Sequence, residues 1–228
     1  MEDVGVMSCV KHFPGHGDTD SDSHKSLPTI NHDYNRLKDI ELYPFKKLFD
    51  KGVGSVMVAH LNIPALGTKE GQASTLTKAI ATSLLRDSLK YQGLAFTDAL
   101  NMKGVSAYFK PGEVDLRAFK AGNDVLLFPE DVPTAIAMIK QAIDSGDVSI
   151  EELDDKVRRI LQAKFHYNVF GFKPLIKDNV HSDLFNSDFY NIEEKIFEAS
   201  ITCLKNEGNQ LPRSNAVKNT IAVVFLGA

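Results

Sequence analysis

Four short runs of this sequence are apolar without interruption, and longer segments with helical spacing of hydrophobic residues separate them. Strands that are apolar at every position are typically buried on both faces, as in parallel sheets covered by helices. Alternation of such strands with helices is typical of βαβ units, so we expect an α/β fold. The runs expected to form strands are 4–10, 53–59, 94–97 and 124–128.

Helical patterns fill the intervals between these runs. In 34–51 and 77–91 the apolar residues recur on one side of a helix, and Gly52 and Gly93 follow as stop signals. The same spacing predicts further helices over 114–120, 132–145 and 150–166.

Polar residues stand at or just past the ends of the first three runs, namely Lys11 and His12, His60, and Asp98. In a (β/α)8 barrel the carboxyl ends of the strands carry the catalytic residues. Four strands cannot close a barrel of eight. We therefore expect 1–170 to form the C-terminal half of a (β/α)8 TIM barrel, as a partial catalytic domain, or to be a fragment of a longer protein.

The character of the sequence changes after the last of these helices. Residues 171–190 are polar, contain Pro174 and lack periodicity, which is typical of a linker. Beyond them, 191–204 has the pattern of a helix and 221–226 that of a fifth buried strand. We expect 191–228 to begin a second α/β domain.

Composition excludes several classes of function. A net charge of −4 gives no basic field for nucleic acid. No apolar run approaches the roughly 20 residues that cross a bilayer, and the N-terminus lacks the pattern of a signal peptide. We expect a soluble protein whose compartment, bacterial cytoplasm or periplasm, stays open. Cys9 and Cys203 lie in apolar surroundings and are expected to be buried thiols.

The densest polar stretch is 11–24, Lys-His-Phe-Pro-Gly-His-Gly-Asp-Thr-Asp-Ser-Asp-Ser-His. Its glycines and proline indicate a loop, and the loop follows a buried strand, so we expect it over the barrel mouth. Asp22 and His24 are close enough for the carboxylate to orient the imidazole. Such a pair can donate a proton to a leaving group and later take one from water.

Calcium binding is one alternative for this loop. Asp18, Asp20 and Asp22 have the spacing that begins an EF-hand loop. The sixth position would be Ser23 where Gly is expected, and the twelfth would be Thr29 where Glu is expected. A calcium site therefore matches the motif only in part.

A zinc site and a solvated loop without function are two further interpretations of the same stretch. His12, His16 and His24 could bind zinc, but their spacing matches no zinc motif and no cysteine accompanies them. A solvated acidic loop is less expected because three histidines and three aspartates gather at the carboxyl end of a strand.

Asp98 is the second candidate for chemistry because it ends a buried strand between apolar neighbours. It is a candidate nucleophile, and the alternative is a cap for the next helix. Lys11 and His12 are placed to donate hydrogen bonds to sugar hydroxyls, with loop anchoring as the alternative. His60 is a further candidate for substrate binding, or a packed histidine bonded to the backbone.

The motifs resemble a known family. Lys-His-Phe-Pro-Gly-His-Gly at 11–17, followed by Asp-Ser-His at 22–24, is similar to the signature of glycoside hydrolase family 3 β-N-acetylglucosaminidases. The resemblance covers nearly the whole chain in order, and the Asp-Ser-His block is highly specific within the family. The remaining similar blocks are 56–60, 96–105, 121–127 and 199–208.

The resemblance implies roles for individual residues. Asp98 would be the nucleophile of a covalent glycosyl-enzyme, and His24 the acid/base oriented by Asp22. No metal or organic cofactor is implied, and the C-terminal segment would begin the family's α/β sandwich. Sugar contacts would come from Lys11, His12 and Met102.

We therefore expect a retaining glycoside hydrolase that removes terminal β-linked N-acetylglucosamine, with peptidoglycan-derived fragments as the substrate class. Its partner would be a carbohydrate and not nucleic acid. A β-glucosidase, a β-xylosidase or an N-acetylglucosaminide phosphorylase of the same family are enzymatic alternatives. Two non-enzymatic interpretations are a calcium-stabilised binding module without catalysis and an inactive fragment.

Overall fold

The structure is a computed structural model that describes residues 1–22, 26–171 and 178–209. The chain divides into two compact units, Met1–Phe172 and Lys173–Ala228, and each is described by itself. Among the described residues, no helix is both long enough and apolar enough to cross a membrane.

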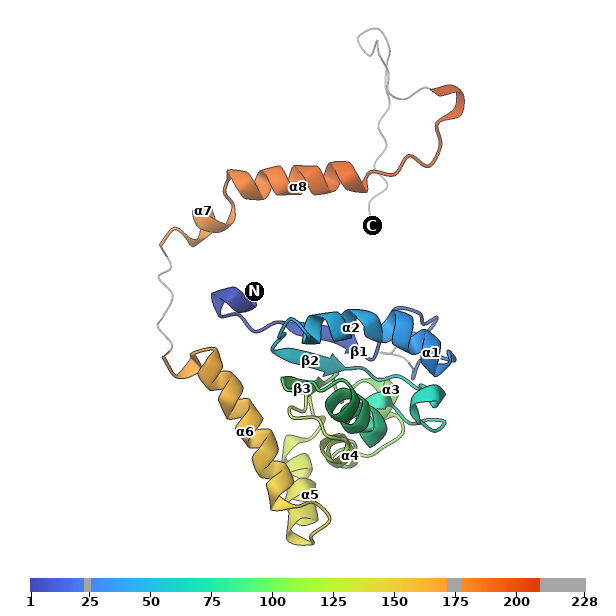
Figure 1. The fold of residues 1–228 in the computed structure, drawn as a ribbon, viewed down its shortest axis with the longest axis vertical. Helices are drawn as coiled ribbons and strands as arrows, with labels where there is room; N and C mark the ends of the chain where they lie inside the picture. The colour runs from blue at the N-terminus through green and yellow to red at the C-terminus, as the bar shows by residue number, and fades with distance from the viewer. Residues whose placement is uncertain (23–25, 172–177, 210–228) are drawn as a thin grey trace. The chain divides into compact units, whose positions relative to one another are not determined.

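A parallel sheet forms the centre of the first unit (Figure 1). Its hydrogen-bonded strands are β1 (Cys9–Phe13), β2 (Ser55–Val58) and β3 (Leu94–Thr97), in that order across the sheet. Parallel pairing brings the carboxyl ends of all three strands to one edge, as the sequence predicts. The expected α/β class with a parallel sheet is confirmed.

Strand register is set by the middle strand. Val56 of β2 pairs with Val10 of β1 on one side and with Ala95 of β3 on the other. The pairing of β1 with β2 shifts between Val10 and Phe13, so β1 is irregular where it meets the following loop.

The fourth expected strand, 124–128, is reduced to a single bridge between Val125 and Phe96. The Thr97 amide donates to the Val125 carbonyl at 3.0 Å, and the Leu100 amide donates to the Leu127 carbonyl at 2.9 Å. The segment therefore runs beside β3 and supplies the fourth strand position, although its pairing is too short for a regular ladder.

Helices follow each strand, and α2 packs against β1 (Figure 1). Within the described residues of the first unit, the α-helices are α1 (Tyr34–Arg36), α2 (Leu42–Phe49), α3 (Lys103–Ser106), α4 (Glu113–Ala121), α5 (Val132–Asp144) and α6 (Ile150–His166). Two segments, Leu37–Glu41 and Ala79–Ser88, are π-helical. Single 3-10 turns cover Glu2–Val4, Pro64–Leu66, Ser74–Leu76 and Val169–Gly171.

The helix boundaries follow local signals in the sequence. The Ser149 hydroxyl accepts from the Glu152 amide at 3.1 Å and so caps the start of α6. Gly122 ends α4 with φ +114°, a conformation that disfavours residues with a Cβ. A Cβ at Gly122 would also clash with the Thr82 hydroxyl, so this position requires glycine for two reasons.

The main core lies between the sheet and the helices that follow β1 and β2. The rings of Phe13 and Phe45 meet edge to face with centroids 5.3 Å apart, which joins β1 to α2. Each fully buried aliphatic or aromatic side chain stabilises the fold by roughly 1.5–3 kcal/mol. The other large members of the cluster include Leu42, Val56, Val58, Ile80 and Leu85.

A buried ion network fastens two helical segments to the sheet. The Asp124 carboxylate is fully buried and accepts from Arg86 at 2.6 Å and from Arg159 at 2.8 Å. It also accepts from the Ala95 amide of β3 at 2.8 Å. One carboxylate therefore ties the Ala79–Ser88 segment, α6 and β3 together.

The start of the chain corrects the expected first strand. Strand β1 begins at Cys9, so 4–10 is not its extent, and Lys11 and His12 lie within β1 and not past its end. Glu2–Val4 is a 3-10 turn. Cys9 is exposed, contrary to expectation, because β1 is an edge strand of the described sheet.

The physical reason for this shift is the Glu2 side chain. Its carboxylate accepts from the Ser8 amide at 2.7 Å and the Gly54 amide at 3.0 Å, and it also bonds the Tyr167 hydroxyl. These contacts tie the turn at Glu2–Val4 to Ser8 and Gly54, so β1 begins only at Cys9.

In the described part of the second unit, residues 178–209, the helices are α7 (Val180–Leu184) and α8 (Ser187–Ser200), followed by a 3-10 turn at Glu207–Asn209. The expected linker therefore includes α7. Helix α8 begins earlier than expected because the Asn186 side chain accepts from the Asp188 and Phe189 amides, each at 3.0 Å.

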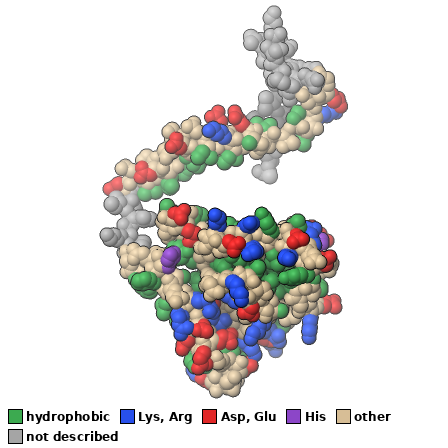
Figure 2. All heavy atoms as spheres, viewed as in Figure 1, with side chains coloured by type: hydrophobic (Ala, Val, Ile, Leu, Met, Phe, Trp, Pro, Cys, Tyr) green, Lys and Arg blue, Asp and Glu red, His purple; other side chains and the backbone are tan. Residues whose placement is uncertain are grey.

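Helix α8 is amphipathic, with green apolar side chains along one side in Figure 2. Ile192, Ile196 and Phe197 on this helix are between 57% and 63% exposed. Cys203 is exposed as well, contrary to expectation. The strand expected over 221–226 lies outside the described residues, so the α/β sandwich stays a prediction.

We predict that Asp124→Asn lowers the free energy of unfolding by roughly 3 kcal/mol, because it leaves two partly buried guanidinium groups without their counter-ion. Chemical denaturation measures this change. The matched control is Asp144→Asn, which breaks an exposed ion pair with Lys140 and should change little. Equal losses in the two variants would contradict a structural role for the buried network.

Candidate active site

A cleft of about 1300 Å³ opens beside β1 and holds several of the predicted site residues. Its walls come from β1, the glycine-rich loop after it, the Leu37–Glu41 segment and α2. Lys11, His12, Asp22 and Asp98 all line it. The structure therefore brings four of the predicted residues to one cavity.

Asp98 lies at the carboxyl end of β3, where its amide donates to the Val58 carbonyl at 2.9 Å. Its Oδ1 accepts from the Ala99 amide at 2.8 Å, and its side chain is 13% exposed. The N-cap of the next α-helix is Met102, so Asp98 does not cap that helix. One carboxylate oxygen is fixed by the backbone, and the other remains for the cleft.

His12 faces Asp98 across the cleft. Its Nε2 lies 3.8 Å from Asp98 Oδ2, and its ring meets the His16 ring edge to face at a centroid distance of 5.9 Å. The side chain is 31% exposed, so a ligand in the cleft can reach it. Lys11 precedes it on β1 and is exposed at the same cavity.

His60 is fully buried behind Asp98. Because a carbonyl only accepts, Nε2 carries the proton and donates to the Ala99 carbonyl at 2.9 Å, while Nδ1 lies 2.8 Å from the Thr75 hydroxyl. Burial lowers the pKa of His60, which keeps the imidazole neutral. This geometry matches the packed-histidine alternative, and both ring nitrogens are engaged within the protein.

Met102 is 8% exposed and is not part of the cleft lining. Its amide donates to the Ala99 carbonyl at 3.1 Å, so it belongs to the turn that follows Asp98. Its contact with sugar stays a prediction.

Asp22 lines the cleft, and its carbonyl accepts from the Ser26 amide at 3.1 Å. His24 lies outside the described residues, as do Ser23 and Lys25. The pairing of Asp22 with His24 therefore stays a prediction.

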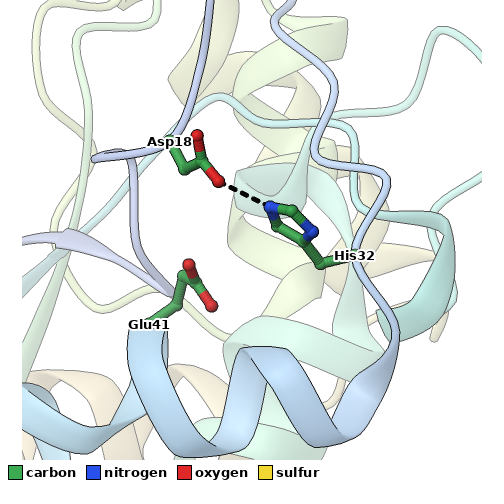
Figure 3. A group of neighbouring side chains, drawn as sticks. All are labelled: Asp18, His32 and Glu41. Atoms are coloured by element: carbon green, nitrogen blue, oxygen red, sulfur yellow. Dashed lines mark hydrogen bonds and ion pairs between the residues drawn. The ribbon is translucent and has the colours of Figure 1, made fainter.

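Sequence reasoning missed a polar cluster at the cleft, in which Asp18, Arg36 and Glu41 line the cavity and His32 contacts Asp18. His32 Nε2 lies 2.6 Å from Asp18 Oδ2, and the Arg36 guanidinium donates to Glu41 at 2.9 Å and to Asp18 at 3.5 Å. Figure 3 shows Asp18, His32 and Glu41 pointing toward one another. The hydrogen bond from His32 and its charge lower the pKa of Asp18.

The sequence does contain one signal for this cluster. Glu41 stands between Leu37 and Phe45 at four-residue spacing, so it is an acid on the apolar side of a helix. Its partners come from other elements, and no local spacing links them.

The calcium alternative is not supported by the arrangement of the loop. Asp18 lies against His32 and Arg36, whereas the Asp20 carboxylate accepts from the Ser21 hydroxyl at 3.1 Å, so the two aspartates have different partners. Within the described part of the chain, the group that brings potential metal ligands together is Asp18, His32 and Glu41, without Asp20 or Asp22.

We predict that His60 makes stability depend on pH. Its folded pKa is below the value near 6.5 of the unfolded chain, so the unfolded state takes up the proton first as pH falls. The stabilisation is present above about pH 6.5 and is lost below it, by up to about 1.4 kcal/mol per pH unit.

Denaturation at pH 7, 6 and 5 measures this pH dependence, and His60→Gln should show a flatter dependence than the natural chain. His166→Gln is the control because that histidine is exposed. An unchanged slope in His60→Gln would contradict the assignment of a neutral buried imidazole.

Comparison with known proteins agrees with these motifs. Residues 1–163 match the family described as "Glycosyl hydrolase family 3 N terminal domain". Beta-hexosaminidase A of Pseudoalteromonas piscicida is 33% identical over 95% of this chain and 39% of its own length. Beta-hexosaminidase LpqI of Mycobacterium tuberculosis is 33% identical over 72% of this chain and 43% of its own length.

Comparison with a solved structure supports the same family. The glycoside hydrolase family 3 beta-N-acetylglucosaminidase from Paenibacillus sp. str. FPU-7 superimposes with a TM-score of 0.83 at 37% identity. The alignment covers 91% of this chain and 40% of that one, so the chain spans about two fifths of the relatives it matches. The family match, together with the parallel sheet and the cleft, shows that the chain belongs to glycoside hydrolase family 3 and that residues 1–163 belong to its N-terminal domain.

Proposed function

We propose that the protein is a retaining glycoside hydrolase that removes terminal β-linked N-acetylglucosamine through a covalent glycosyl-enzyme. The observation that carries this proposal is the Asp98 carboxylate at the carboxyl end of β3, in the wall of the cleft. The family and the beta-hexosaminidases among its relatives support the choice of substrate.

The position of Asp98 supports its role as the carboxylate nucleophile. Retention requires a carboxylate on one face of the anomeric carbon and a proton donor on the other. The Ala99 amide holds Oδ1 at 2.8 Å, which fixes the plane of the carboxylate and leaves Oδ2 for attack. Buried His60 bonds the Ala99 carbonyl at 2.9 Å, so we assign it as a positioning residue for this turn.

The proton donor in this proposal is His24, oriented by Asp22. Asp22 lines the cleft that also contains Asp98, and His24 follows it by two residues in the sequence. An imidazole with a pKa near 6.5 can protonate the leaving oxygen and later take a proton from water near neutral pH. The loop would thus supply the function that a second carboxyl group supplies in most glycosidases.

The sugar itself would be bound by Lys11 and His12. Both line the cleft from β1, and both present nitrogen donors to a ligand. His12 lies 3.8 Å from Asp98, so the group that binds a hydroxyl lies beside the attacking oxygen. We keep Met102 as a proposed contact with the sugar.

The charge of the proton donor indicates which leaving groups the site can accept. A histidine carries less negative charge than a glutamate, so the site should tolerate anionic leaving groups such as muramic acid. Peptidoglycan-derived fragments are therefore the proposed source of substrate. The same argument permits phosphate as acceptor, and comparing hydrolysis with phosphorolysis of an aryl N-acetylglucosaminide separates the two reactions.

We predict that Asp98→Asn lowers the turnover of an aryl N-acetylglucosaminide by at least about a thousandfold, because the amide cannot form the glycosyl ester. The measurement is a steady-state assay in the longest form of the protein that can be produced. Asp87→Asn is the control because that aspartate is exposed on another element. Mass spectrometry of the natural enzyme should find the sugar on the peptide that contains Asp98, and a retained activity in Asp98→Asn would exclude this role.

We predict that His24→Ala lowers the turnover of substrates with poor leaving groups by roughly 10²–10⁴-fold, which is the contribution of general acid catalysis. The turnover of activated aryl glycosides should fall much less, since their leaving groups need no proton. Asp22→Asn should show the same pattern in weaker form. Equal losses on both classes of substrate would show that His24 does not donate the proton.

A further inference from the structure

The polar cluster of Asp18, His32 and Glu41 has the composition of a metal site. Each residue offers one ligand atom, and these atoms lie within 4.8 Å of one another. The ligands come from the glycine-rich loop, from the segment before α1 and from the Leu37–Glu41 segment, so the fold and not a local motif assembles them (Figure 3).

A second observation points to a ligand between these side chains. The Glu41 side chain is 5% exposed, and its Oε2 is buried without a hydrogen-bond partner among the described residues. Buried carboxylate oxygens are nearly always paired, since leaving one unpaired is costly. Figure 3 shows the Glu41 carboxylate turned toward Asp18 and His32.

Arg36 now supplies the positive charge at this cluster. It bonds Glu41 Oε1 at 2.9 Å and reaches Asp18 at 3.5 Å. Its side chain is 40% exposed, so it can turn into solvent when another cation takes its place. Two carboxylates and a neutral imidazole would balance the charge of one divalent ion.

We propose that Asp18, His32 and Glu41 form a zinc-binding site in which the metal replaces the Arg36 guanidinium. Zinc accepts one imidazole nitrogen and two carboxylate oxygens, and three protein ligands leave a fourth position for water. Calcium and magnesium prefer sets made entirely of oxygen with six or more ligands.

The ligand atoms need small rearrangements to bind zinc. Tetrahedral ligands at about 2.0–2.1 Å from the metal lie about 3.3 Å from one another. The 2.6 Å contact between His32 and Asp18 must open and the longer separations must close. Asp18 is 58% exposed on a loop and is free to make this adjustment.

This site differs from the zinc set that the sequence spacing suggested. That set consisted of His12, His16 and His24, whereas the new set includes none of them. Asp18 and Glu41 of this set line the cleft, and the set does not include Asp98, so its ligands are separate from the candidate nucleophile. Bound zinc would link the glycine-rich loop to the helical segment that carries Glu41 and would stabilise both.

The test is a zinc titration of the protein by competition with a chromophoric chelator, with thermal melting as a second readout. We expect one saturable zinc per chain and a higher melting temperature with zinc. His32→Gln and Glu41→Gln should each weaken binding at least tenfold, while His16→Gln, the matched control on the same loop, should bind as the natural chain does.

Arg36→Met gives the decisive result, because it removes the competing cation and should tighten zinc binding several-fold. Weaker binding in Arg36→Met would overturn the displacement of Arg36. Absence of saturable zinc, zinc binding unchanged in His32→Gln, or equal binding of calcium would overturn the site itself. Circular dichroism of each variant confirms folding, and Asp98→Asn should bind zinc normally, so this test is independent of the proposed function.

Discussion

The hydrogen bond from the Asp98 amide to the Val58 carbonyl is the contact on which the site depends. It extends the pairing of β2 and β3 to the carboxyl edge of the sheet, where strands of one direction must all end. A carboxylate held by rigid backbone costs little ordering entropy when a ligand arrives. The candidate nucleophile is thus placed by the sheet and not by a loop.

Buried polar side chains also fix the carboxyl edge of the sheet, from the side that faces away from the cleft. His60 is neutral because it is buried, and it bonds the turn after Asp98 from inside. Asp124, at the start of segment 124–128, likewise joins separate elements, because its carboxylate binds Arg86, Arg159 and a backbone amide of β3. These buried polar groups are therefore paired, and each pair fixes one element against the sheet.

Ion pairs hold the opposite wall of the cleft together. Arg36 lies between Asp18 and Glu41, and His32 bonds Asp18 from the other side. These contacts fasten the loop that leads to Asp22 onto the helical segment after it. Because the cluster is partly exposed and ionic, it can exchange one cation for another while the apolar core stays unchanged.

The sequence by itself determined the alternation of strands and helices, the span of β3 and the position of Asp98 at its end. Apolar runs, capping residues and helix-ending glycines act locally, so they can be read without coordinates. The true start of β1 escaped that reasoning because a carboxylate near the N-terminus bonds the Gly54 amide far along the chain.

Only the tertiary structure decided which polar side chains meet. The closeness of His12 to Asp98, the burial of His60 and the cluster around Glu41 all join residues from separate elements. Their positions follow from the packing of helices on the sheet, and packing depends on contacts between segments that no local spacing encodes.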